Sequence, residues 1–114
     1  MKVLFHIDSM DLWPMTIGNV RNLVDNFEES GQLFDVEIVA NGEAVKGVIA
    51  KNGEKEAKQL AELAEKHVII AACNNALTTY GLKPDDIHSF IKIVPAGVVE
   101  IAEKQQEGYN YIKP

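Results

Sequence analysis

Short apolar runs alternate along the chain with segments whose apolar residues recur at helical spacing. The runs are rich in strand-forming residues and cover residues 2–7, 33–40, 67–73 and 91–94. After the first run, Ile17, Val20, Val24 and Phe27 follow one another at three- and four-residue intervals. This spacing predicts an amphipathic helix that begins near Trp13 and ends at Gly31.

Three further segments are predicted to be helical. They cover residues 54–66, 74–81 and 95–108. Residues 41–49 fit either a turn followed by a short helix or a loop. The final segment, YNYIKP, is predicted to be an edge strand, because its terminal proline cannot donate to a sheet.

The alternation of strands and helices predicts βαβ units and hence an α/β fold. We expect a three-layer α/β/α domain with a mostly parallel sheet of about five strands. The run at residues 67–73 is apolar throughout, which is typical of a parallel strand buried on both faces. The length of 114 residues fits a single domain over residues 1–114, and the pattern leaves the strand order open.

Charge and composition exclude several partners. The net charge is −6, from 17 acidic and 11 basic side chains, and there is one arginine. We therefore expect no nucleic-acid binding and no anionic membrane surface as partner. The apolar run in MKVLFHID is too short for a signal peptide, and one cysteine cannot form an internal disulfide. A cytoplasmic location is the expectation.

Candidate chemistry gathers where the predicted strands end, because the carboxyl ends of parallel strands lie along one edge of the sheet. Most of the residues leaving the strands are polar or small. They are Asp8 after the first strand, Asn41 and Gly42 after the second, Cys73, Asn74 and Asn75 after the third, and Pro95 and Gly97 after the fourth. We expect these residues to line a ligand pocket.

Cys73 is the sole cysteine and precedes a predicted helix. Unpaired N–H groups and the helix dipole at such a position favour a thiolate, which is the nucleophilic form. Asn74 or Asn75 is a candidate cap for this helix. A small buried hydrophobe is an equally common role for a free cysteine, and both interpretations stay open.

His6 and Asp8 point to the same face of the first strand and are candidates to manage a proton near the thiol. A buried histidine that is hydrogen-bonded to a neighbour is the commoner alternative. Trp13 stands in a connecting segment, where we expect it to cover the ligand edge or to enter a subunit interface.

No motif indicates a metal or a cofactor. The three histidines and the cysteine lack metal-ligand spacing, and neither a Walker motif nor G-x-G-x-x-G occurs. We therefore expect no metal and no cofactor.

Several segments together resemble the DsrE/DsrF-like family, also described as the YchN-like fold. They are FHID, VRNLV, VEIVANGEAV, AACNNAL and VPAGVVEIAEKQQEGYNYIKP, which span nearly the whole chain. The ending is the most specific part, and the AACNNAL segment is the next.

The resemblance implies a compact α/β/α domain that forms homo-oligomers, often trimers or hexamers. It also implies sulfur handling, in which Cys73 is the counterpart of a cysteine that carries a persulfide. The expected function is therefore a sulfur carrier or a sulfurtransferase-like protein that works with a sulfur donor or acceptor protein. The alternative is a non-catalytic oligomeric module that binds a small anion or metabolite at the strand ends.

Overall fold

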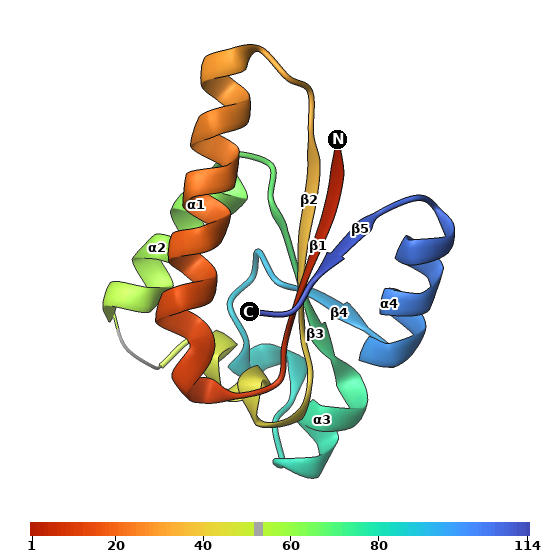
Figure 1. Cartoon of the computed structure of the whole chain (residues 1–114). Helices are drawn as coiled ribbons and strands as arrows, with labels where there is room; N and C mark the ends of the chain where they lie inside the picture. Colours follow the sequence, from red (N-terminus) through yellow and green to blue (C-terminus); the bar gives the residue numbers. More distant parts are fainter. Residues whose placement is uncertain (52–53) are drawn as a thin grey trace.

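The computed structural model describes residues 1–51 and 54–114 and contains a five-stranded sheet in which all pairs are parallel. The strand order is β4-β3-β2-β1-β5 (Figure 1). The strands are β1 (Lys2–Ile7), β2 (Asp35–Ala40), β3 (Ile69–Cys73), β4 (Lys92–Val94) and β5 (Asn110–Ile112). The α-helices are α1 (Trp13–Ser30), α2 (Glu54–Glu65), α3 (Asn74–Thr79) and α4 (Gly97–Gln106), and the 3-10 helices are η1 (Met10–Leu12), η2 (Gly42–Val48) and η3 (Pro84–Asp86).

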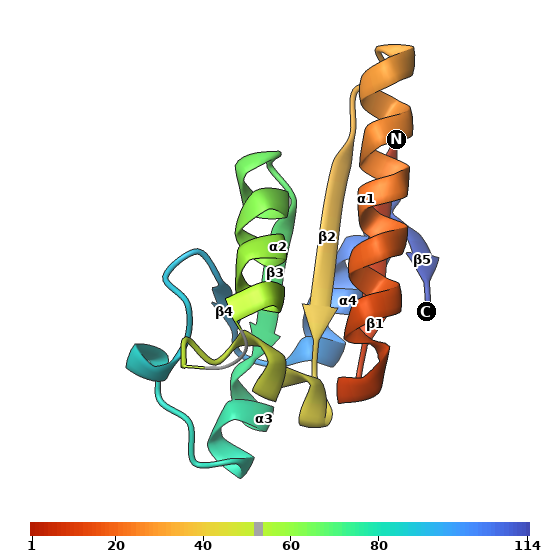
Figure 2. The same cartoon turned by 90° about the vertical axis from the view of Figure 1, so that its left-hand side faces the viewer.

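The sheet lies between two unequal helical layers, as predicted. Helices α1 and α2 cover one face and α4 covers the other, while α3 lies beyond the carboxyl ends of the strands (Figures 1 and 2). The larger core lies under α1 and α2. A cluster of only four buried residues lies on the α4 side, made of Leu4, Val39, Ala71 and Val94.

Local sequence explains the element boundaries. Pro14 occupies the first turn of α1, where its missing N–H costs nothing, and Gly31 ends the helix with φ 72°. The segment at 41–49, left open by the sequence, forms the 3-10 helix η2. β3 is exposed only at its first residue, which confirms the expected burial on both faces.

The chain steps across the sheet from β1 to β4 and then returns. Helix α4 crosses the opposite face and places β5 beside β1. This return puts the first turn of α4 next to the carboxyl ends of the strands. Within the described residues, no helix is both long and apolar enough to span a membrane.

Burial in α4 and at Trp13 follows from contacts of the folded chain. In α4 the buried residues are Gly97 and Glu100, whereas Val98 is 67% exposed. Trp13 does not reach outward to an interface: it is 3% exposed, and its Nε1 donates to the carbonyl of Ala44 at 3.0 Å. In both places the contacts of the folded chain, rather than local spacing, decide which side is buried.

Candidate functional site

Cys73 lies at the junction of a strand and a helix, as predicted: it is the last residue of β3 and the N-cap of α3. Its strand partner is Val94 of β4. The residue is 7% exposed and belongs to the main hydrophobic cluster. The expected placement at the carboxyl edge is therefore correct, and the thiol is nearly covered in this conformation.

Gly97 brings the first turn of α4 onto Cys73 and Asn41. A Cβ added at Gly97 would lie 3.0 Å from the Cβ of Asn41 and 3.3 Å from the Cβ of Cys73. The first distance is at the lower limit of real contacts, so glycine permits this close approach. Three predicted site residues therefore lie close together, namely Cys73 of β3, Asn41 after β2 and Gly97 of α4.

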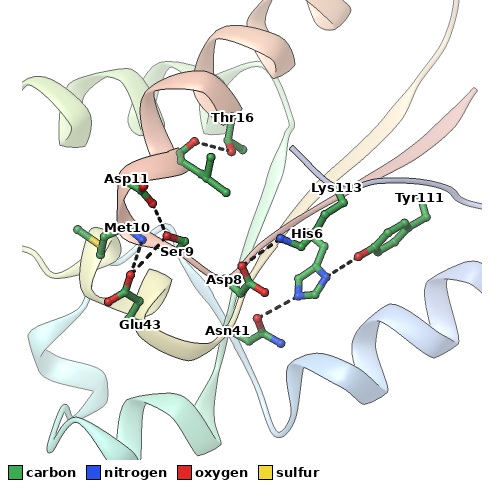
Figure 3. A network of polar contacts seen from close by, with 11 residues as sticks. His6, Asp8, Ser9, Met10, Asp11, Thr16, Asn41, Glu43, Tyr111 and Lys113 are labelled. Carbon is green, nitrogen blue, oxygen red and sulfur yellow. Dashed lines mark hydrogen bonds and ion pairs between the residues drawn. The ribbon is translucent and has the colours of Figure 1, made fainter.

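A chain of hydrogen bonds orients the Asn41 amide. His6 Nε2 lies 3.0 Å from Asn41 Oδ1, and His6 Nδ1 lies 2.6 Å from the hydroxyl of Tyr111 (Figure 3). Because the amide oxygen can only accept, Nε2 carries the hydrogen, and in the neutral ring Nδ1 accepts from Tyr111. The Asn41 Nδ2 group is thereby turned away from His6, and it lies 3.5 Å from the point where a Gly97 Cβ would stand.

His6 therefore reaches the thiol neighbourhood through Asn41. Within the described part of the chain, its hydrogen bonds go to Asn41 and Tyr111 and none goes to Cys73. The structure places His6 in a hydrogen-bonded position, half-buried at the edge of the site. These hydrogen bonds orient Asn41, and they do not include the Cys73 sulfur.

Asp8 extends the same polar edge. Its Oδ1 lies 3.0 Å from Nζ of Lys113, and this hydrogen bond holds the pKa of Asp8 below its ordinary value (Figure 3). Gly42 adopts φ 54°, and a Cβ there would stand 3.3 Å from the Asp8 carbonyl oxygen. Asp8 and Gly42 are thus neighbours, as expected from their positions after β1 and β2.

Asn74, Asn75 and Pro95 lie at the same edge but point to solvent. All three are exposed. The proposed capping role of the two asparagines was wrong, because Cys73 itself is the N-cap and α3 has no side-chain cap. These residues border the site and do not form its interior.

Sequence reasoning missed Tyr111 and Lys113, which complete the polar edge. Both come from the end of the chain, where β5 pairs with β1. The alternation in YNYIK does place Tyr109, Tyr111 and Lys113 on one strand face. Their meeting with His6 and Asp8 depends on the pairing of β5 with β1, which the sequence leaves open.

No group of three histidine, cysteine, aspartate or glutamate side chains that could hold a metal occurs in residues 1–51 and 54–114. The site instead contains the Cys73 thiol, the oriented amide N–H group of Asn41 and the N-termini of helices α3 and α4. Such groups can bind an anion and support a sulfur nucleophile.

The fold agrees with comparisons to known proteins. The model of the DsrE/DsrF-like family matches residues 10–114, so the chain belongs to this family. The family is implicated in sulfur metabolism.

Solved structures with the same fold cover almost the entire chain. A protein of unknown function from Methanobacterium thermoautotrophicum, MTH1491, has 31% identity and a TM-score of 0.88, over 99% of this chain and 98% of its own. The ychN protein from E. coli has 15% identity and a TM-score of 0.73, with 100% of both chains covered. BT1422 from Bacteroides thetaiotaomicron has 15% identity and a TM-score of 0.74, over 99% and 94% of the two chains. No curated protein matches at a significant level.

Proposed function

We propose that this protein is a cytoplasmic sulfur carrier, with sulfurtransferase-like chemistry, in which Cys73 holds sulfane sulfur as a persulfide. The Cys73 thiolate attacks the outer sulfur of a donor persulfide or of thiosulfate. A new S–S bond forms at Cys73 while the S–S bond of the donor breaks, and the electron pair leaves with a thiolate or with sulfite. An acceptor thiolate then takes the outer sulfur and returns Cys73 as a thiolate, so no external oxidant is needed.

The observation that carries the proposal is the meeting of Cys73 with the first turn of α4. The first N–H groups of a helix have no partner within the helix, and they favour a neighbouring negative charge. α3 begins at Cys73, and α4 begins at Gly97, whose missing Cβ lets it lie against Cys73. Both the thiolate and the terminal sulfur of a persulfide carry the negative charge that this place favours.

Asn41 has a defined part in the proposal. Its amide nitrogen and the Cβ of Cys73 both lie within 3.5 Å of the point that Gly97 leaves free. Asn41 Nδ2 donates a hydrogen bond to the outer sulfur, and His6 with Tyr111 holds the amide in that orientation. Asp8, expected as a proton manager, pairs with Lys113 and keeps a positive side chain at the edge of the site.

The direct test is intact-protein mass spectrometry after incubation with a polysulfide or thiosulfate. The wild-type chain is expected to gain the mass of sulfur on Cys73, and to lose it again to a small-molecule thiol. Cys73→Ser is expected to gain none. A wild-type protein that stays unmodified with both donors contradicts the proposal.

A second variant tests the geometry around the thiol. Gly97→Ala fills the point shared by Asn41 and Cys73, so sulfur loading is expected to slow by about tenfold or more, as misplacement of reacting groups does. Gly18→Ala is the matched control, because a Cβ at Gly18 has nothing within 4 Å. Equal loading rates in the two variants would remove Gly97 from the proposed mechanism.

The burial of Cys73 favours one alternative, a non-catalytic module that binds a small anion or metabolite at the strand ends. Cys73 is 7% exposed and packs in the main cluster, which suits a purely structural thiol. In that case Cys73→Ala keeps anion binding, measured with sulfate or thiosulfate by calorimetry. The native thiol would then also react slowly with an alkylating reagent at every pH.

We also propose that the chain forms a homo-oligomer, a trimer or hexamer, and meets a donor or acceptor protein. Val98 and Val99 of α4 are 67% and 51% exposed, which supports an interface there. Light scattering is expected to give a mass of three or six chains. Val98→Glu is expected to shift that mass toward the monomer, and a wild-type monomer at all concentrations contradicts the assembly.

A further inference from the structure

Glu37 is a glutamate in the middle of a buried strand. It lies in β2 between Leu4 of β1 and Ile69 of β3, and its residue exposure is 0%. It shares with Val39 the sheet face that α4 covers. Neither carboxylate oxygen has a hydrogen-bond donor among the described residues. An ionised carboxylate in such a place would be costly, so the group needs a proton or a partner.

The facing partner is a second carboxylate, Glu100 of α4. Glu100 is 8% exposed, and Nζ of Lys92 lies 3.5 Å from its Oε2. A protonated Glu37 can donate to the Glu100 carboxylate, and this arrangement satisfies both groups with one proton. Burial, followed by the hydrogen bond to Glu100, raises the pKa of Glu37 to about 8. The hydrogen bond from Glu37 lowers the pKa of Glu100.

Other charged and titratable groups around the pair come from each neighbouring element. Lys104 of α4 and Lys92 of β4 favour negative charge on the pair. Tyr109 packs beside the small cluster under α4, and burial, with nearby carboxylates, raises its pKa. Lys2 of β1 lies over the Tyr109 ring at 5.8 Å from its centroid. The proton of the Glu37–Glu100 pair therefore lies close to both positive and negative side chains.

We propose that the proton shared by Glu37 and Glu100 is a latch that holds α4 on the sheet and so controls access to Cys73. Glu100 lies three residues after Gly97, so the first turn of α4, which approaches Cys73, also contains Glu100. Apolar contacts under α4 are few, namely the cluster of four buried residues with Ile101 and Tyr109. The polar pair is thus a large share of what fixes this helix. The latch does not depend on sulfur chemistry at Cys73.

The direction of the pH effect follows from proton linkage. When α4 lifts, water reaches Glu37 and its pKa returns toward the ordinary value of 4.5. The closed state keeps its proton up to about pH 8, whereas the open state has already lost it. Opening of α4 therefore becomes up to about tenfold more favourable per pH unit between these values, and levels off above them.

The experiment compares wild type with Glu37→Gln, whose amide imitates the protonated acid at every pH. Hydrogen exchange of α4, followed by mass spectrometry, is measured from pH 5.5 to 9. The ratio of wild-type to variant exchange cancels the intrinsic pH dependence of exchange. This ratio is expected to rise severalfold to tenfold per pH unit up to about pH 8. Glu103→Gln, an exposed position on the same helix, is the matched control and should give a flat ratio.

Alkylation of Cys73 supplies the second readout. The wild-type to Glu37→Gln ratio of alkylation rates cancels the ionisation of the thiol, and it is expected to rise over the same pH range. Flat ratios in both measurements overturn the latch. Should Glu37→Gln fail to fold, wild type alone decides: exchange in α4, corrected for its intrinsic rate, must rise with pH faster than exchange in α1, and equal pH dependence overturns the proposal.

Discussion

Replacing Glu37 by glutamine should change how the stability of the whole domain depends on pH. A group whose folded pKa lies above its unfolded value contributes stability that is fully present below the unfolded pKa and is lost as pH rises through the folded pKa. For Glu37 the two values are 4.5 and about 8. Wild type should therefore lose stability through this interval, because the unfolded chain releases a proton that the folded chain retains.

The magnitude follows from the width of the interval. One pKa unit corresponds to about 1.4 kcal/mol, so the full loss is of the order of 3 to 5 kcal/mol. Small domains are stable by only about 5 to 15 kcal/mol, so the effect is large enough to measure easily. Glu37→Gln keeps the donor toward Glu100 and has no proton to lose. Its free energy of unfolding should match that of wild type near pH 5 and exceed it by several kcal/mol at pH 8.

Urea unfolding at several pH values measures this difference. The free energy of unfolding of the variant minus that of wild type is plotted against pH, so that contributions of all other groups cancel. Glu100 acts in the opposite direction: its lowered pKa contributes stability that is lost as pH falls below its unfolded value of 4.5. A difference that stays constant from pH 5 to 8 would refute the shared proton.

Two further predictions concern the polar edge and the core. Tyr111→Phe removes the donor to His6 Nδ1 and should lower the free energy of unfolding by about 0.5–1.5 kcal/mol. The ¹⁵N chemical shifts of His6 should then show a loss of the single Nε2–H tautomer. Unchanged shifts would contradict the tautomer assignment. Gly47→Ala places a Cβ within 2.8 Å of ring atoms of Trp13 and should lower stability by about 1–3 kcal/mol in thermal unfolding. Gly18→Ala, with open space inside α1, should instead raise stability by about 0.5–1 kcal/mol, and equal effects of the two alanines would contradict the packing argument.

Local patterns predicted most of the fold because they carry its hydrophobic periodicity. The four apolar runs became β1 to β4, and the helical spacing before Gly31 became α1. The order of strands was not predictable, since it depends on which strand edges meet after each crossover. The buried side of α4 was not predictable for a related reason: the residues that face the sheet there are Gly97 and Glu100, which hydrophobic spacing does not reveal.

The site was predicted where it follows from topology and missed where it depends on pairing. Parallel strands bring their carboxyl ends together, so Asn41, Cys73 and Gly97 could be grouped from the sequence alone. The link from His6 to Tyr111 requires β5 to lie beside β1. The burial of Cys73 and the approach of Gly97 to it also required the structure, because both depend on how α4 packs at the strand ends.

Helix α4 buries little apolar surface, and this connects access, charge and assembly. α1 buries six residues against the sheet, whereas α4 buries two, of which one is a glycine and the other a carboxylate. Elements with little buried apolar surface open at low free-energy cost, so α4 should lift from its contact with Cys73 more readily than α1 leaves the sheet. An oligomer that covers Val98 and Val99 would hold the same helix down from outside. Assembly and the shared proton should therefore both slow reaction of Cys73, and dilution to monomers should speed alkylation of the wild type at pH 6 and at pH 8.5 alike. Alkylation rates that do not change on dilution would contradict a role of assembly in holding α4.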